Sequence, residues 1–427
     1  MPELGEVIVG LDIGTTKVAV IIGEVTARGV DIIGVGSAPS EGLRDGVVVN
    51  IEATTNSIAA AIHEAEQMAA VDVRSVYVGT AGGHIQGFTS LGQVSMRNRE
   101  VTEADVARVL EQAKAVNIGL ERQILHTLPL EYMIDGQGRI GDPIGMSGVR
   151  MEVRAHVITA ASTAVQNIVK CCNRAGLDVV DVVLEPLASA TAVLHADERD
   201  LGVVMLDIGG GTTDICLYSE GANVYSSVIV MGGHRVTQDI AHCLRTSVGE
   251  AEQLKRDHGC ALVSMVEGED LIEVPGVGPR PPRTFERRFL SEVIEPRIEE
   301  IFLLAQQELM NSGFMELAAS GVVLTGGAAQ MRGMCEIAED IFQMPVRCGM
   351  PAAGQKAGSR SDALALTDGG FSGVIQDPRY ATGVGLVLHG AREDLVDVAG
   401  SMETQAPIEQ GPSLARRMFD RVRDAFF

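Results

Sequence analysis

The sequence predicts an α/β protein built of two related halves, and two observations support this prediction. Residues 11–22 read LDIGTTKVAVII and residues 206–217 read LDIGGGTTDICL, so the chain carries the same short device twice. Each copy is an apolar strand ending in an aspartate, a turn of Gly and Thr, and a second β-rich run. Around the copies, β-branched runs bounded by glycine or proline alternate with helical periodicity, which is typical of α/β folds.

The elements of the first half follow from local patterns. Residues 6–25 predict two consecutive strands around a turn, and residues 30–40 predict a third strand. Residues 52–70 predict a helix, because their apolar side chains recur at helical spacing, and residues 75–82 return to a strand. An antiparallel hairpin therefore begins a mixed sheet.

The sequence pattern changes between residues 84 and 161, where we expect a separate small α/β insertion. Its helix is predicted over residues 101–116, with Thr102 as N-cap and Asp105 three residues later in a variant of the capping box. Residues 163–194 then predict a helix, a strand and a further helix.

The second half is expected to begin near residue 200 with the second Asp-Gly device. Later in it, residues 273–283 predict a loop that leads into a helix over residues 285–313. Residues 320–333 predict a strand that ends in a double glycine before a helix. Residues 393–411 are acidic and aperiodic, which indicates a solvated linker.

Composition excludes several classes of function. The net charge of −23 repels phosphate backbones, so we expect no nucleic-acid partner. The seven cysteines form no Cys-x-x-Cys pair, and an odd number without a signal peptide indicates reduced thiols in a cytosolic protein. No segment offers the roughly 20 consecutive apolar residues of a membrane span.

The two Asp-Gly turns have the chemistry of a phosphate site. Glycine lets backbone N–H groups approach a phosphate closely, and threonine hydroxyls add donors. A carboxylate just before such a turn can hold a hydrated Mg²⁺. A single turn of this kind would be an ordinary hairpin, but two copies facing each other could grip a triphosphate from both sides. The sequence has no P-loop motif.

The motifs together resemble the FtsA family of bacterial cell-division proteins over essentially the whole chain. They are GLDIGTTKVA, SGVRM, LDIGGGTTDI, HGCAL, GPRPPR, EVIEPR and VLTGGAAQ. The twin turns and the late Thr-Gly-Gly alone resemble the wider actin superfamily. The resemblance implies an actin-like (ribonuclease-H-like) two-lobed fold with an FtsA-type inserted subdomain and a C-terminal amphipathic helix.

The resemblance also implies a division of the chain. We expect a first actin-like core subdomain over 1–83, 162–199 and 350–392, with the inserted small α/β subdomain over 84–161. The second core subdomain is expected over 200–230 and 305–349, with a small partner-binding subdomain over 231–304. An acidic flexible linker over 393–411 and a membrane-targeting helix over 412–427 complete the chain.

By this resemblance the two halves close on ATP and Mg²⁺. Asp12 and Asp207 are expected to hold the Mg²⁺ through water, and Glu185 to orient the attacking water. The residues expected at the nucleotide are Asp12, Gly14, Thr15, Thr16, Lys17, Asp207, Gly209, Gly210, Gly211, Thr212, Thr213, Gly232, Gly233, Glu252, Lys255, Gly326 and Gly327.

Three of these assignments have structural alternatives. Glu252 and Lys255 could belong to a solvated helix face. Glu185 could be an N-terminal helix acid beside Pro186, favourable to the helix dipole. No general base for a second substrate is evident, so ATP is expected to act as a conformational ligand with at most slow ATPase activity.

The last residues, 412–427, read PSLARRMFDRVRDAFF and predict an amphipathic helix. Its apolar face carries Leu414, Met418, Phe419, Val422 and Phe426, and its charged face carries Arg416, Arg417, Arg421 and Arg423. Arginines on an otherwise acidic protein favour anionic inner-membrane lipid as the partner. A helix docked on its own domain or on another protein is the alternative.

Arginines also gather between residues 280 and 297. They could pair locally with glutamates on a solvated helix face, or grip the carboxylates of an extended acidic peptide. The resemblance implies the second, with Arg283 and Arg297 contacting the C-terminal tail of FtsZ.

The expected function is that of an actin-like ATP-binding protein that polymerises on the cytoplasmic face of the inner membrane. There, as a peripheral protein at the division site, it would tether FtsZ, form filaments with itself and help recruit later division proteins. The alternatives are a small-molecule kinase of the same fold and an actin-fold scaffold of a pilus or secretion assembly.

Overall fold

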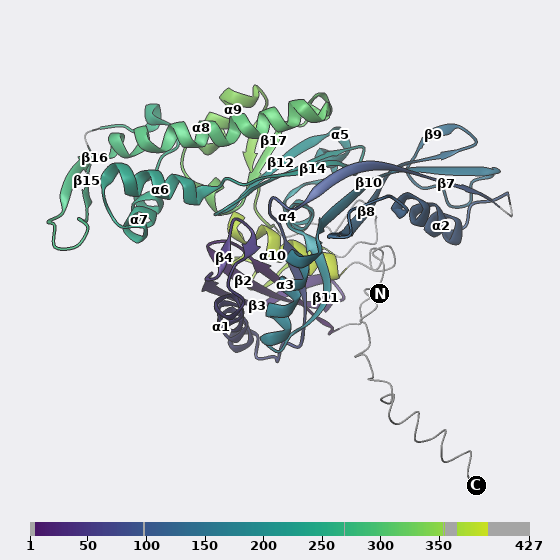
Figure 1. Ribbon diagram of the computed structural model, residues 1–427, viewed down its shortest axis with the longest axis horizontal. Coiled ribbons are helices and arrows are strands. Elements are labelled where there is room, and N and C mark those ends of the chain that lie inside the picture. Colours follow the sequence, from purple (N-terminus) through teal and green to yellow (C-terminus); the bar gives the residue numbers. More distant parts are fainter. Residues whose placement is uncertain (1–4, 97–98, 269, 353, 355–364, 392–427) are drawn as a thin grey trace, which may run out of the picture.

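The structure is a computed structural model that describes residues 5–96, 99–268, 270–352, 354 and 365–391. Its described strands form three larger sheets and two two-stranded sheets. Figure 1 shows one sheet with α1 (Ile51–Ala69) and α3 (Ser162–Arg174) in the lower part of the view, and the sheets of residues 86–161 and 203–348 above it. The inserted sheet and the β15–β16 hairpin lie at opposite ends of this upper part.

The first sheet has the order β11-β6-β1-β2-β3-β19. The strands β1, β2 and β3 are antiparallel, and β6, β11 and β19 join them in parallel. In chain order the strands are β1 (Val7–Ile13), β2 (Lys17–Thr26), β3 (Gly29–Pro39), β6 (Ser75–Thr80), β11 (Asp178–Leu184) and β19 (Leu366–Gly370). The predicted hairpin and third strand are therefore confirmed. The helices α1 (Ile51–Ala69) and α3 (Ser162–Arg174) contribute to its buried core.

A second sheet repeats this topology, with the order β14-β13-β12-β17-β18. Its strands are β12 (Val203–Ile208), β13 (Thr213–Ser219), β14 (Ala222–Ile229), β17 (Val322–Thr325) and β18 (Val346–Cys348). Three antiparallel strands are again followed by two parallel ones. The prediction of two related halves is confirmed, because β12 and β13 occupy the places that β1 and β2 hold in the first sheet.

A shared apolar layer lies between the two sheets. It is built from α4 (Glu185–Val193), α10 (Ala381–Gly390) and the buried faces of both sheets. All of α10 from Ala381 to Leu388 is buried, and this helix packs against α4 and β1. The two lobes are thus joined by packed helices as well as by the chain.

The inserted subdomain has its own sheet and core. The sheet order is β7-β10-β8-β9, with β7 (Gln86–Ser95), β8 (Arg122–Ile134), β9 (Gln137–Ile140) and β10 (Arg150–Ala161). The helix α2 (Glu103–Lys114) packs on this sheet and completes a separate apolar cluster. The side chain of Thr102 caps it in a full capping box with Asp105, which confirms the predicted helix start.

The outer part of the second lobe is mainly helical. It contains α6 (Gly233–Leu244), α7 (Val248–His258) and the long helix α8 (Arg287–Ser312). The predicted loop over residues 273–283 is wrong at its ends, because β15 (Leu271–Val274) and β16 (Arg283–Glu286) pair antiparallel. The helix consequently begins at Arg287 rather than at Phe285. The expected boundary at residues 304/305 falls inside α8, which runs through it without a break.

Short elements complete the described fold. They are β4 (Leu43–Arg44), β5 (Val47–Val48), α5 (Ala196–Leu201), α9 (Met334–Phe342) and the 3-10 turns Val263–Met265, Met315–Leu317, Gly327–Gln330 and Pro378–Tyr380. Among the described residues, no helix is long and apolar enough to cross a membrane. The predicted linker and terminal amphipathic helix lie outside the described residues.

Candidate functional site

The two Asp-Gly turns have the same local geometry. Asp12 and Asp207 are each the penultimate residue of their strands, β1 and β12. In the first turn the N–H of Gly14 donates to the carbonyl of Lys17 at 3.0 Å, and in the second the N–H of Gly209 donates to that of Thr212 at 2.9 Å. The repeat in the sequence is therefore a repeat of a closed backbone turn.

The fold brings these two turns into contact. A Cβ placed on Gly210 would lie 2.4 Å from Cγ2 of Thr16, and one on Gly211 would lie 2.6 Å from Oγ1 of Thr15. Such distances leave no room for a side chain at either glycine. The turns meet at a cavity of about 750 Å³ between the lobes, large enough for a nucleotide-sized ligand.

Most of the predicted site residues line this cavity. They are Asp12, Gly14, Thr15, Thr16, Lys17, Glu185, Asp207, Gly209, Gly210, Thr212, Gly233, Glu252, Lys255, Gly326 and Gly327.

Gly211, Thr213 and Gly232, also predicted, are not part of the cavity lining. The hydroxyl of Thr213 donates to the carbonyl of Met231 at 2.8 Å, which links β13 to the segment that follows β14. Gly232 packs against the backbone of the second turn.

Four carboxyl groups line or adjoin the cavity: those of Asp12, Asp207 and Asp214 are buried, and that of Glu185 is half-buried. Burial is the main cause that raises the pKa of each of them above its usual range. For Asp207 the pKa rises to about 6. Lys17 lies beside the cluster, with its Nζ 3.4 Å from Oδ2 of Asp12. Bound protons or a bound cation would therefore stabilise this cluster of carboxyl groups.

Hydroxyl groups from distant segments hold Asp207 in place. Oγ of Ser189 on α4 donates to its Oδ2 at 2.6 Å, and Oγ1 of Thr382 on α10 lies 3.5 Å from the same atom. Sequence reasoning missed both residues, because neither stands in a recognisable motif. It also missed Arg379 and Gln330, which line the cavity from the short turns at its rim.

Glu252 and Lys255 are not the solvated helix face that the local pattern permits. Nζ of Lys255 donates to Oε2 of Glu252 at 2.7 Å and to the carbonyl of Gly233 at 3.1 Å. The Lys255 side chain is only 11% exposed, and its burial lowers the pKa of the ammonium group. The pair connects α7 to the start of α6 at the cavity wall.

Glu185 lies both at the start of a helix and at the cavity. It is the first residue of α4, with Pro186 following it in the first turn, and it also lines the cavity. After burial, the negative charges of Asp12 and Asp214 are the next causes that raise its pKa well above the usual range.

A metal ion in this cavity would have to be held through water. In the part of the chain that the structure describes, no three His, Cys, Asp or Glu side chains are arranged to hold a metal ion directly. One buried oxygen, Oδ1 of Asp214, has no hydrogen-bond partner. An ion bridged by water to Asp12 and Asp207 fits this arrangement, because water can span the gaps between acidic groups and the ion.

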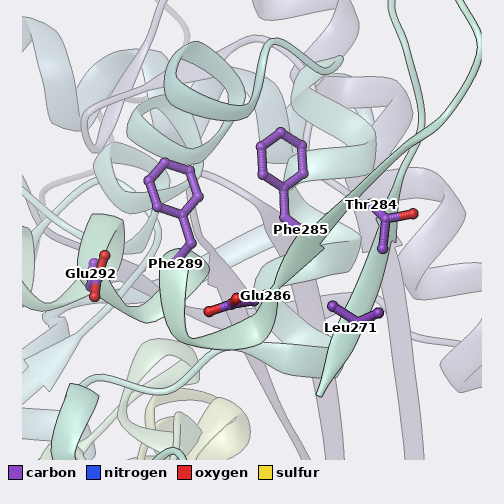
Figure 2. Close-up of a pocket in the computed structure, with 6 residues that line it drawn as sticks. All are labelled: Leu271, Thr284, Phe285, Glu286, Phe289 and Glu292. Carbon is purple, nitrogen blue, oxygen red and sulfur yellow. The ribbon is translucent and has the colours of Figure 1, made fainter. Parts of the chain in front are cut away.

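A separate groove of about 590 Å³ lies at the β15–β16 hairpin and the start of α8 (Figure 2). It is lined by Leu271, Thr284, Phe285, Glu286, Phe289 and Glu292, and the rings of Phe285 and Phe289 stack with centroids 5.7 Å apart.

The guanidinium group of Arg283 lies 5.3 Å from the ring centroid of Phe285, and it donates to the carbonyl of Leu244. On α8, Arg297 instead pairs with Asp239 through Nε at 2.6 Å and Nη2 at 3.2 Å, and also with Glu300. The local pairing with glutamates that the sequence allows is present at Arg288, whose Nε lies 3.5 Å from Oε1 of Glu292.

Two lobes of one topology that meet at a cavity between twin Asp-Gly turns define the actin-like class. A type IV pilus PilM–PilN complex matches with a TM-score of 0.63 and 20% identity, over 90% of this chain and 98% of that one. MreB5 of Spiroplasma citri matches with a TM-score of 0.50 and 18% identity, over 81% of this chain and 92% of that one.

The sequence relatives identify the particular family. The Cell division protein FtsA of Pseudomonas aeruginosa is 48% identical over 95% of this chain and 96% of its own length. That of Escherichia coli is 41% identical over 99% and 98%, and that of Bacillus subtilis 38% over 91% and 84%. The family model for FtsA matches residues 204–385 and that for the SHS2 domain inserted in FtsA matches 82–159. The chain belongs to the FtsA family of cell division proteins.

A model for the type IV pilus assembly protein PilM also matches residues 144–261. This match is shorter than the alignments to FtsA proteins, and the structural likeness to PilM is at the level of the fold. The pilus-scaffold alternative is therefore not favoured.

Proposed function

We propose that this protein binds ATP between its lobes, polymerises at the cytoplasmic membrane and tethers FtsZ there, helping to recruit later division proteins. The observation that carries this proposal is the cavity between the twin Asp-Gly turns. Membership of a cell-division family supports the role in division. The neighbouring MreB5 structure is described as bound to ADP, which supports a nucleotide as the ligand of this fold.

The residues around the cavity fit Mg-ATP in a specific arrangement. The backbone N–H groups of the two turns and the hydroxyls of Thr15 and Thr16 would bind phosphate oxygens. Asp12 and Asp207 would hold the metal through water, and Lys17 would add a positive charge. Glu252 and Lys255 also line the cavity, where they would contact the ribose and the base. The bound Mg²⁺ would supply charge neutralisation among the four carboxyl groups.

ATP is proposed as a conformational ligand rather than as a substrate of small-molecule chemistry. The acidic groups of the cavity gather around the proposed phosphate site, and Glu185 is the candidate for orienting water in slow hydrolysis. The alternative of a small-molecule kinase would be favoured if ATP turnover rose on addition of a sugar or carboxylic acid.

The arginine segment is proposed as the docking site for the acidic C-terminal tail of FtsZ. The groove in Figure 2 offers two stacked aromatic rings for apolar side chains, with Arg283 directly beside Phe285. Arg297 is about one quarter exposed and already forms a bidentate ion pair with Asp239. A peptide carboxylate would therefore have to share or displace Asp239.

We expect a chain ending at Gly411 to lose membrane attachment. Residues 412–427 carry four arginines and an apolar face in a protein of net charge −23, and such a helix binds anionic lipid. In sedimentation with anionic liposomes, Mg-ATP and FtsZ, the full chain should pellet and carry FtsZ with it, whereas the truncated chain should leave both in the supernatant. Equal pelleting of the two chains would contradict membrane attachment by the tail. Neutral liposomes serve as the control.

We expect Arg283→Ala and Arg297→Ala each to weaken binding of an FtsZ tail peptide about tenfold, because a charge-assisted hydrogen bond contributes roughly 1.5–3 kcal/mol. Arg154→Ala is the matched control, since Arg154 on β10 pairs with Glu131 at the surface of the inserted subdomain. Asp239→Ala should preserve or tighten binding by freeing Arg297. Fluorescence anisotropy with the labelled peptide measures all four variants. Equal affinities of the two test variants and the control would place the tail elsewhere.

A further inference from the structure

One side chain of the inserted subdomain bonds to the backbone next to Glu185, which lines the ATP site proposed above. His126 lies on β8, and its Nε2 accepts a hydrogen bond from the backbone N–H of Leu184 at 2.9 Å. Leu184 is the last residue of β11 and the N-cap of α4, whose first residue is Glu185. The inserted subdomain is therefore in direct contact with the backbone that carries the candidate water-orienting carboxyl group.

This hydrogen bond satisfies the N–H group of Leu184 at an edge of the sheet where no further strand pairs. β11 is an edge strand of the first sheet, with β6 as its one strand neighbour there. Leu184 is fully buried, so its N–H group requires a partner other than water. The partner comes from a different subdomain, 58 residues earlier in the chain. The position of β8 and the position of the Leu184–Glu185 peptide are thus linked.

The surroundings keep the His126 imidazole in the form that can accept this bond. Burial is the largest cause, and it lowers the pKa of His126 to about 4. At neutral pH the ring is therefore uncharged, with a lone pair on Nε2 and the proton on Nδ1. The start of β8 is fixed as well, because Nη2 of Arg122 donates to the carbonyls of His84 at 3.0 Å and Thr159 at 2.9 Å.

Glu185 has little freedom to adjust if this junction moves. A Cβ on Gly79 of the neighbouring strand β6 would lie 2.9 Å from Cγ of Glu185, so the side chain is packed directly on that backbone. A shift of the Leu184–Glu185 peptide would therefore displace the carboxyl group itself. Small displacements of a reacting geometry have large effects on rate.

We propose that His126 is a positioning residue through which the inserted subdomain sets the orientation of Glu185 and hence the rate of ATP hydrolysis. This inference rests on the proposed function, since it needs ATP at the cavity. It gives the inserted subdomain a regulatory role: a protein that binds there and moves β8 would change the rate of ATP turnover.

The test compares His126→Leu with His126→Gln in the full-length chain. Leucine removes the acceptor, and glutamine can present an oxygen near the place of Nε2. We expect His126→Leu to lower the single-turnover rate of ATP hydrolysis about tenfold, with the Kd for ATP changed less than about twofold. His126→Gln should restore most of the rate. The melting temperature of each variant is measured in parallel.

His156→Leu is the matched control for general damage to the subdomain. His156 lies on β10 beside β8, is 2% exposed, and has an Nε2 atom without a partner. Its substitution should leave the hydrolysis rate unchanged. Equal rates for wild type and His126→Leu, no hydrolysis by wild type, or an equal loss in His156→Leu would each overturn the inference while ATP binding stands. Absence of ATP binding to wild type would overturn the proposed function, and this inference with it.

Discussion

Gly326→Ala is expected to abolish ATP binding and to destabilise the fold by about 3 kcal/mol or more. Gly326 directly follows the strand β17 and has φ 86° and ψ 166°, a conformation that is essentially restricted to glycine. A Cβ at this position would lie 2.3 Å from Oδ1 of Asp207 and 2.7 Å from the carbonyl oxygen of Ile208. The added methyl group would therefore push the second Asp-Gly turn out of place. Urea unfolding and equilibrium binding of a fluorescent ATP analogue measure the two effects.

A glycine outside the cavity provides the control. Gly373 is exposed, and a Cβ there would meet no atom within 4 Å. Gly373→Ala should change the free energy of unfolding by less than about 0.5 kcal/mol and leave ATP binding intact. If the two alanine variants behaved alike, close packing of Gly326 against the turn would not be what holds the site together.

Local patterns predicted much of this fold because strands, turns and helix starts are encoded by neighbouring residues. The hairpin of β1 and β2, the capping box of Thr102 and the twin turns all depend on chemistry within a few positions. The duplication was the strongest signal, since one device seen twice implied two lobes before any contact was known. The resemblance to a known family then supplied what local chemistry alone left open, such as the place of Glu252 and Lys255.

The parts that could not be predicted depend on contacts between distant segments. Ser189 and Thr382 meet beside Asp207 although they are 193 residues apart in the chain. Nothing in the sequence around His126 indicates that its side chain bonds to the backbone of Leu184. The sequence predicts a loop in place of the hairpin of β15 and β16, because these strands are only four residues long and enclose several glycines and prolines. In each case tertiary packing, rather than local preference, decides the structure.

Asp207→Asn is expected to stabilise the nucleotide-free protein at neutral pH, while removing its affinity for Mg-ATP. In the folded chain the pKa of Asp207 is raised to about 6, against an ordinary value of 3.8, chiefly because burial disfavours the charged carboxylate. A shift of about two pH units corresponds to roughly 3 kcal/mol. An asparagine carries no charge at any pH, and its Oδ1 can still accept from Ser189.

The direction of the pH dependence follows from proton binding. Below pH 3.8 the carboxyl group is protonated in both states, whereas between 3.8 and about 6 the folded chain holds the proton more tightly than the unfolded chain does. The stability that comes from this proton is therefore complete at low pH and is lost as the pH rises through 6. Asp207→Asn avoids that loss, so its advantage over wild type should be larger at pH 7.5 than at pH 5.

Urea unfolding at pH 5 and pH 7.5 without nucleotide tests this expectation, with exposed Asp368→Asn as the control that should show no such change. The variant should exceed wild type by about 2–3 kcal/mol at pH 7.5 and by clearly less at pH 5. Saturating Mg-ATP should then reverse the order at pH 7.5, because a ligand stabilises the chain that binds it. A difference between variant and wild type that is the same at both pH values would mean that the charge of Asp207 is already compensated in the free protein. The carboxyl cluster would then not be the reason that this site binds a cation.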